Sequence, residues 1–269
     1  MNAIFLTSKI DLYIKDANGN KNPKQFGNKN QILDNFKKYI KKYDNFLYVA
    51  SVEDEPELTD IYSKPMFESF ELTLPFKNYQ VLDGRTKDKA KEMVENADFI
   101  VLAGGHLPSA NKFINNINLR DFIRNTDAVI CGISAGSMNC ADVVYCPPEL
   151  DGESLDSNFE IYLKGLNLTN INIMPHYNTL QYDVLDGKDV MKDIILPESY
   201  KTEMLALDDF SYVLIDGNEK TIYGSAYTIS NGEVVQINGK WTSIRFDLLK
   251  GVLWYIWFVM DKQMITKTT

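Results

Sequence analysis

Ser134 stands between two glycines in the run Gly-Ile-Ser-Ala-Gly at 132–136, directly after the apolar residues 128–131. A G-x-S-x-G run between a strand and a helix is typical of a nucleophile elbow, in which a sharp turn exposes the serine hydroxyl at the carboxyl edge of a sheet. A tight strand-to-helix turn without chemistry uses the same residue types. Because a serine hydroxyl is a weak nucleophile, catalysis also requires a neighbouring base, usually histidine.

The chain contains two histidines, His106 and His176. His176 follows an apolar segment in "NIMPHYN", so we expect it at the end of a strand, at the edge where open α/β sheets bind ligands. His176 is therefore the predicted base. The alternative is a strand-end histidine that only caps a loop.

The segment "LAGGHLP" contains a glycine pair that lets the backbone approach a bound group closely. We predict the N–H groups of Gly105 and Ala135 as oxyanion donors, each worth about 3–4 kcal/mol in the transition state. A plain glycine turn between a strand and a helix is compatible with this role.

A base of this kind needs a carboxylate that fixes its tautomer. Asp208 and Asp209 lie at the end of a later predicted strand, and side chains alternate along a strand, so only one of them can face the site. Asp142 and Asp183 are alternatives that the pattern leaves open.

Apolar runs alternate with helical patterns through the first half of the chain, which predicts a mostly parallel sheet with helices on both faces. Pro65 is expected to break or restart its helix. The predicted strands are 3–8, 46–51, 79–83, 98–105 and 128–133, and the predicted helices are 30–43, 57–72, 86–97 and 110–126.

After the elbow we expect a helix over 135–144 and a polar loop over 146–158. The predicted strands there are 171–178 and 203–209, followed by hairpins over 212–239. One α/β domain over 1–245 is the prediction, with an apolar C-terminal extension over 246–269. The uninterrupted apolar part of the extension is about 10 residues, against about 20 for a membrane span. We expect a terminal helix on the body of the protein or in a subunit contact.

The formal net charge of −9 argues against nucleic-acid binding, which requires a basic surface. Three cysteines (Cys131, Cys140 and Cys146) without a C-x-x-C pair favour a reducing compartment and argue against a zinc ribbon. The first residues lack the features of a signal peptide, so a cytoplasmic location is expected. We expect no metal and no cofactor.

With these residues in view, the chain resembles the aspartyl dipeptidase (peptidase E) family of serine peptidases and its cyanophycinase relatives. The matching segments are "FIVLAGG", "GISAGS", "INIMPHYN" and "MLALDDFSYVLI". They occur in the order Ser–His–acid, whereas α/β-hydrolases have Ser–acid–His. The resemblance implies a class I glutamine amidotransferase-like (flavodoxin-like) fold.

The resemblance also implies roles for individual residues: Ser134 as nucleophile, His176 as base and Gly105 as oxyanion donor. The family's glutamate falls on Asp209, which is one methylene shorter and would need a small shift of its strand. His106 falls where the dipeptidase has an asparagine. His106 and Asn178 are expected to contact the substrate.

The arginine that the family resemblance associates with an acidic substrate has no counterpart in "TLQYDVLDGKDVMKDI", where Lys188 offers a charge instead. The predicted function is a serine peptidase acting on small peptides, dipeptidase-like, through a Ser-His-Asp triad. The alternative is a catalytically silent or regulatory glutamine-amidotransferase-like binding protein. Amidotransferase chemistry itself needs a cysteine at the elbow, and Cys131 comes three residues too early. A small peptide is the expected partner and a homodimer the candidate assembly, with membrane attachment through the tail as the minority alternative.

Overall fold

The computed structural model describes residues 3–17 and 21–237. The apolar extension predicted over 246–269 lies outside the described residues, and the predicted domain boundary at residue 245 stays a prediction. Within the described ranges, no helix combines the length and the apolar character that crossing a membrane requires.

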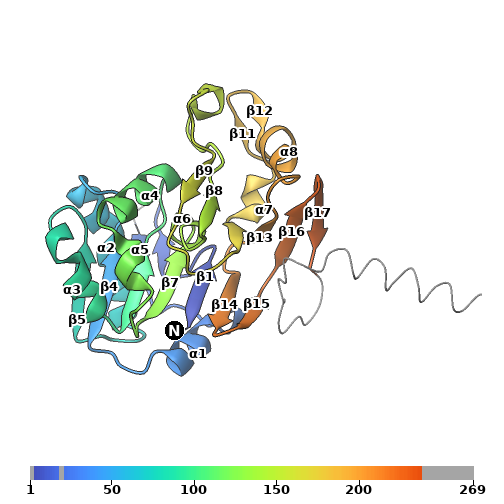
Figure 1. Cartoon of the computed structure of the whole chain (residues 1–269). Helices are drawn as coiled ribbons and strands as arrows, with labels where there is room; N and C mark the ends of the chain where they lie inside the picture. The colour runs from blue at the N-terminus through green and yellow to red at the C-terminus, as the bar shows by residue number, and fades with distance from the viewer. Residues whose placement is uncertain (1–2, 18–20, 238–269) are drawn as a thin grey trace, which may run out of the picture.

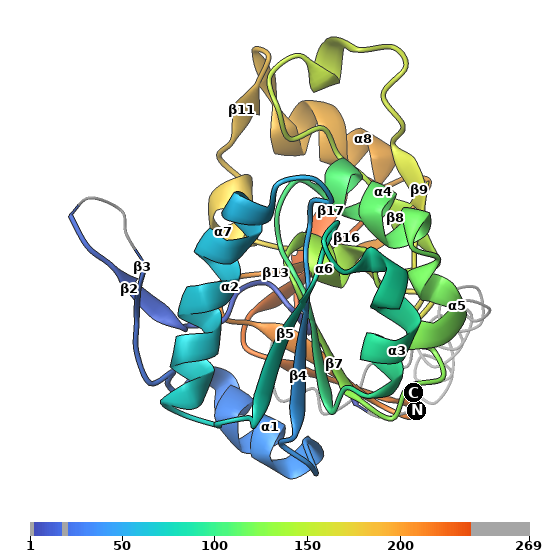
Figure 2. The same cartoon turned by 90° about the vertical axis from the view of Figure 1, so that its left-hand side faces the viewer.

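A seven-stranded sheet forms the centre of the molecule, in the order β15-β14-β1-β7-β6-β4-β5 (Figure 1). The strands β5, β4, β6, β7 and β1 run parallel to one another, whereas β14 pairs antiparallel with both β1 and β15. The predicted fold class is confirmed, because the first five predicted strands form a parallel sheet that helices cover on both faces (Figure 2). The strands are β1 (Ile4–Thr7), β4 (Asn45–Val49), β5 (Asn78–Leu82), β6 (Phe99–Leu102), β7 (Val129–Ile133), β14 (Tyr212–Asp216) and β15 (Glu219–Tyr223).

Helices cover both faces of this sheet (Figure 2). One face carries α1 (Ile32–Tyr39) and α2 (Pro56–Glu71), whose Phe36 and Phe70 rings lie 6.3 Å apart in the core. The other face carries α3 (Ala90–Glu95), α4 (Leu107–Asn116) and α5 (Leu119–Ile123). A short hairpin of β2 (Tyr13–Lys15) and β3 (Lys21–Pro23) stands beside α2.

Pro65 does not interrupt its helix, contrary to the sequence prediction: α2 is continuous from Pro56 to Glu71. A proline inside a helix removes one backbone hydrogen bond and costs about 3 kcal/mol. Met66 and Phe70 follow the proline and are buried in the core, and this burial offsets the loss.

Two other helix predictions are also corrected. The predicted helix over 110–126 is divided into α4 and α5, because Asn118 between them adopts a left-handed conformation with φ of 52°. The helix predicted over 135–144 is only α6 (Ala135–Met138). The chain turns at Asn139, whose carbonyl accepts a hydrogen bond from the N–H of Leu166, and continues as β8 (Val143–Tyr145), paired with β9 (Tyr162–Lys164).

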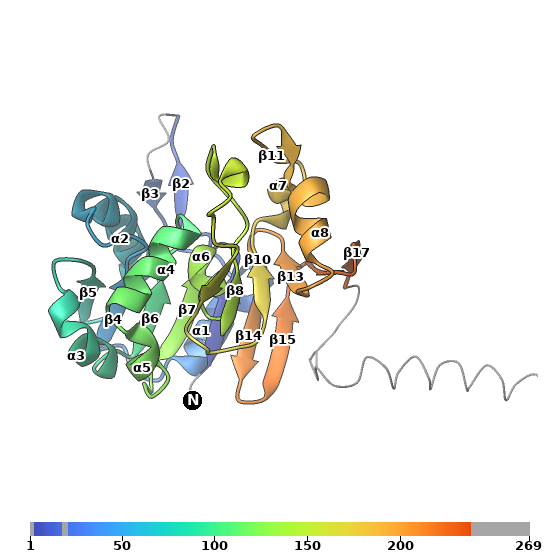
Figure 3. The same ribbon diagram turned by 45° about the horizontal axis from the view of Figure 1, so that its top comes forward.

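A second sheet contains four strands in the order β10-β13-β16-β17. The strands β10 and β13 are parallel, and their side chains alternate between the main core (Ile173, Leu205) and a smaller apolar cluster (Met174, Met204). Figure 3 shows this sheet on the side of β14 and β15. Its strands are β10 (Asn172–Met174), β13 (Met204–Leu207), β16 (Ala226–Ser230) and β17 (Glu233–Gln236).

The segments beside this sheet are short. They are α7 (Tyr177–Leu180), the hairpin of β11 (Val184–Leu185) and β12 (Lys188–Asp189), a π-helical turn (Val190–Ile195), α8 (Leu196–Glu198) and the 3-10 turns Lys29–Gln31, Lys87–Lys89 and Glu153–Leu155. The expectation that the strand of His176 belongs to the sheet of the elbow is wrong, and the strand before Asp209 lies outside that sheet as well. They form the second sheet, whose strand ends nevertheless meet the elbow.

Candidate active site

Ser134 occupies a sharp turn between β7 and α6, with φ of 52° and ψ of −117°. A residue other than glycine at such a positive φ is strained, and strain of this kind is found where a site fixes a side chain. The Ser134 N–H donates a hydrogen bond of 2.9 Å to the Thr7 carbonyl at the end of β1. A Cβ atom at Gly136 would collide with the Leu102 carbonyl, so helix and sheet approach more closely here than any side chain allows.

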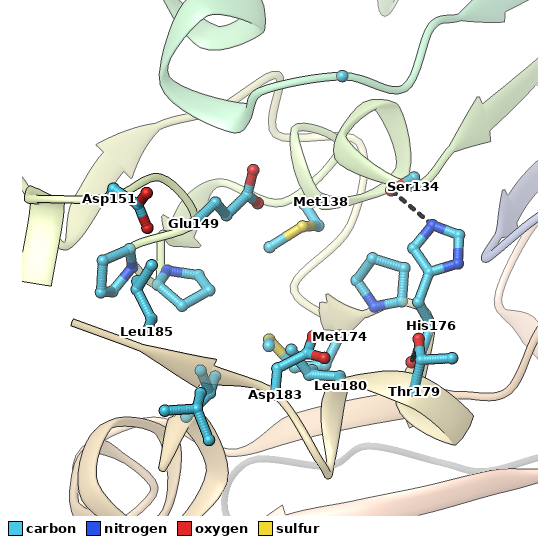
Figure 4. A pocket seen from close by; sticks show the side chains of 16 residues that line it. Ser134, Met138, Glu149, Asp151, Met174, His176, Thr179, Leu180, Asp183 and Leu185 are labelled. Atoms are coloured by element: carbon cyan, nitrogen blue, oxygen red, sulfur yellow. Dashed lines mark hydrogen bonds between the residues drawn. The ribbon is translucent and has the colours of Figure 1, made fainter. Parts of the chain in front are cut away.

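His176 follows β10 and places its ring beside the elbow (Figure 4). Its Nε2 lies 3.1 Å from Ser134 Oγ and its Nδ1 lies 2.6 Å from Asp209 Oδ1. The His176 backbone is left-handed, with φ of 58°, and its N–H donates to Ser8 Oγ at 2.9 Å. These contacts fix the ring between the serine and the carboxylate.

Asp209 follows β13 and accepts hydrogen bonds on both carboxylate oxygens: from His176 on Oδ1, and from Lys9 Nζ on Oδ2 at 3.0 Å. Burial raises its pKa, but the hydrogen bonds from His176 and Lys9 outweigh burial, so the pKa of Asp209 lies below its ordinary value. An ionised carboxylate can only accept, so the ring proton resides on Nδ1 and Nε2 can accept the Ser134 hydroxyl proton.

The other three carboxylates considered in the sequence lie elsewhere. Asp208 Oδ2 accepts from the Tyr227 hydroxyl at 3.3 Å, and Asp142 pairs with Arg120 at 2.7 Å. Asp183 lines a cavity near Ser134. Asp209 is the one of the four that hydrogen-bonds to His176.

The glycine loop lies against the elbow: a Cβ atom at Gly104 would be 3.2 Å from Ser134 Cβ. Among the described residues, no backbone or side-chain acceptor is bonded to the N–H of Gly105 or of Ala135. Both N–H groups are therefore without a protein partner that an oxyanion would have to displace. Their assignment as oxyanion donors stays a prediction.

The two residues predicted on the substrate side make contacts within the protein. His106 Nδ1 lies 2.9 Å from Ser109 Oγ, and its Nε2 lies 2.7 Å from Glu153 Oε1. The Asn178 side chain accepts the Asp209 N–H at 3.0 Å and so supports the carboxylate. Their roles toward substrate stay predictions.

Sequence reasoning missed Ser8 and Lys9. Both follow β1 directly, and β1 lies next to β7 in the sheet, so the end of β1 adjoins the elbow. Polar residues directly after an apolar strand were the available signal, but nothing local indicates that Lys9 contacts a residue 200 positions away.

Two cavities meet at Ser134 and His176. The first, here called the acidic cavity, has a volume of about 530 Å³ and contains the side chains of Glu149, Asp151 and Asp183 (Figure 4). The second, here called the apolar cavity, has a volume of about 630 Å³. Its lining includes Leu12, Tyr13, Tyr48, Leu58, Tyr62 and Met66. Cavities of this size suit small molecules or short peptides.

An elbow serine hydrogen-bonded to a histidine, which is in turn hydrogen-bonded to a half-buried carboxylate, is the arrangement of a serine hydrolase. Comparison with known proteins agrees: the model of peptidase family S51 matches residues 18–223, most of the chain. The chain therefore belongs to peptidase family S51, the peptidase E family of serine peptidases, and the resemblance stated from the sequence is confirmed.

Two solved structures have the same fold. A peptidase from an acI-B1 Actinobacterium has a TM-score of 0.62 at 15% identity, covering 91% of this chain and 97% of its own. A Listeria monocytogenes EGD-e protein assigned to peptidase E has a TM-score of 0.56 at 16% identity, covering 83% of this chain and 98% of its own. A search of the curated proteins found no significant match.

Lys9→Ala is expected to lower kcat/KM for peptide hydrolysis about two- to fivefold, since a solvent-exposed ion pair contributes no more than about 1 kcal/mol. Lys9 helps to lower the pKa of Asp209, so its removal raises that pKa. As pH falls, the variant then loses activity at a higher pH than the wild type. Initial rates measured across the acid range check this, with Lys9→Arg as the matched control. An unchanged acid limb in Lys9→Ala would contradict the role.

Proposed function

We propose that this chain is a dipeptidase-like serine peptidase that hydrolyses small peptides through Ser134, His176 and Asp209. The observation that carries the proposal is the continuous hydrogen-bonded series from Asp209 through His176 to Ser134, with separations of 2.6 and 3.1 Å. The two cavities beside Ser134, of about 530 and 630 Å³, are of the size that small molecules and short peptides occupy, which supports a small substrate.

In the proposed mechanism, Ser134 Oγ attacks the scissile carbonyl carbon and its proton passes to His176 Nε2. The negative charge that forms on the carbonyl oxygen is held by the N–H groups of Gly105 and Ala135. The C–N bond then breaks, and His176 returns the proton to the leaving amine. A water molecule, deprotonated by His176, releases the acyl group from Ser134. Asp209 stabilises the imidazolium in both steps.

Serine-directed phosphonate labelling tests the proposal. A fluorophosphonate is expected to label the wild type at Ser134, found by mass spectrometry of the digested protein, and to leave Ser134→Ala unlabelled. Ser137, one turn away and buried, is the matched control, since Ser137→Ala should still be labelled at Ser134. Absence of labelling in a folded wild type would favour the alternative, a catalytically silent binding protein.

A further inference from the structure

The acidic cavity is lined by three carboxyl side chains that have no basic partner among the described residues. Its lining contains Glu149, Asp151 and Asp183 and neither lysine nor arginine. Burial raises the pKa of Glu149, and a cationic ligand group beside it would favour its ionised form. None of these three carboxylates forms an ion pair with a residue in the described part of the chain. Lys188, the candidate from the sequence for binding an acidic substrate, donates instead to the Ser154 carbonyl at 2.7 Å. An anionic substrate group would be repelled here and a cationic group attracted.

The three carboxylates are spread around the cavity rather than gathered on one point (Figure 4). In residues 3–17 and 21–237, no group of three or more His, Cys, Asp or Glu side chains is arranged to hold a metal ion. The rest of the lining is largely apolar, including Met138, Met174 and Leu185. A long side chain with an apolar stem and a charged end, or an amine, matches this combination.

The apolar cavity extends from Ser134 to side chains of α2 and to Tyr13 at the start of β2. Three tyrosine rings contribute to its wall, and two of its polar side chains are already engaged, Lys9 with Asp209 and His106 with Glu153. The tyrosine rings and the apolar side chains of Leu12, Leu58 and Met66 make this wall suited to an apolar substrate side chain.

We infer that the preferred substrate is a peptide whose scissile bond joins a residue with a cationic side chain to a residue with an apolar side chain. The cationic group occupies the acidic cavity and the apolar group the apolar cavity, with the peptide carbonyl at Ser134 between them. This inference rests on the proposed function and specifies its substrate class.

Dipeptides with the same terminal charges test the inference, because only the side chains then differ. The set is Lys-Phe, Phe-Lys, Glu-Phe, Phe-Glu, Lys-Ser and Ser-Lys. Lys-Phe is compared with Glu-Phe, and Phe-Lys with Phe-Glu. In at least one of these pairs, kcat/KM for the Lys peptide should exceed that for the Glu peptide about tenfold or more. A tenfold preference corresponds to about 1.4 kcal/mol. Replacing Phe by Ser in that Lys peptide should also lower kcat/KM about tenfold or more.

Charge-removing variants link the preference to the cavity. The double variant Glu149→Gln/Asp183→Asn should reduce the ratio of kcat/KM for the Lys peptide to kcat/KM for the Glu peptide at least severalfold. This quantity is called the Lys/Glu ratio below. Asp121→Asn, which removes one charge from an exposed site on α5, should leave the ratio unchanged. In the apolar cavity, Tyr62→Ser should lower the ratio of kcat/KM for the Phe peptide to kcat/KM for the Ser peptide. It should leave the Lys/Glu ratio unchanged.

The outcomes separate this inference from the proposed function. If the enzyme is labelled at Ser134 but cleaves Glu peptides as well as Lys peptides, or cleaves none of the Lys/Phe peptides, the inference is wrong and the proposed nucleophile stands. A Lys/Glu ratio that the double variant does not change would also overturn it. If Ser134 is not labelled and no peptide is cleaved, the proposed function fails as well.

Discussion

Replacing Ser134 with alanine is expected to lower kcat for peptide hydrolysis on the order of 10⁴- to 10⁶-fold. The variant lacks the oxygen that forms the acyl-enzyme, and only substrate binding and the oxyanion donors would remain. His176→Ala should cause a loss of similar size, because Ser134 Oγ has its hydrogen bond to His176 Nε2 as the route for its proton. Since the two residues act as a unit, the double variant should be no slower than either single variant.

The measurement is kcat on a peptide that the wild type cleaves, with circular dichroism to show that each variant is folded. Asp208→Asn is a matched control for the acid, because Asp208 contacts Tyr227 rather than His176. It should retain most of the activity, whereas Asp209→Asn should lose most of it. Strictly additive losses in the Ser134/His176 double variant would contradict the mechanism.

Gly136→Ala is expected to lower the free energy of unfolding by about 3 kcal/mol, the upper part of the range for overpacking. Its Cβ would collide with the backbone carbonyl of Leu102, and backbone atoms of a central strand cannot move aside as a flexible side chain can. The helix α6 must move away from β6 to make room for this Cβ atom. Because Ser134 directly precedes α6, it moves as well, and activity falls.

Denaturant unfolding of the two proteins measures the difference. Gly27→Ala is the control, because a Cβ at Gly27 would meet nothing within 4 Å and Gly27 is not among the glycines with positive φ. Its stability should stay within about 0.5 kcal/mol of the wild type. A Gly136→Ala protein as stable as Gly27→Ala would show that the elbow is not packed as described.

The sequence predicted the inner strands of the central sheet well, because β1, β4, β6 and β7 are short apolar runs whose burial leaves a local pattern. The elbow and its histidine could be found for a similar reason. The G-x-S-x-G run is local, and a chain with two histidines leaves few candidates for a base.

Features that depend on distant contacts could not be found in this way. The assignment of β10 and β13 to a second sheet depends on their pairing with each other and with β16, which apolar character does not specify. The continuity of α2 through Pro65 reflects tertiary burial that overrides a local propensity. Lys9 reaches Asp209, and His106 reaches Glu153, only because the fold brings their loops together.

Ser134 and His176, the proposed nucleophile and base, follow strands of different sheets, and this division has a mechanical consequence. Ser134 is fixed to the end of β1 through the Thr7 carbonyl, and His176 to the same end through the Ser8 hydroxyl. Because both residues are hydrogen-bonded to the end of β1, this segment sets the distance between the Ser134 hydroxyl and the His176 ring. A small shift of one sheet relative to the other would lengthen that distance and abolish activity while every strand and helix remained intact. Catalytic activity therefore reports the relative position of the two sheets more sensitively than any measurement of secondary structure.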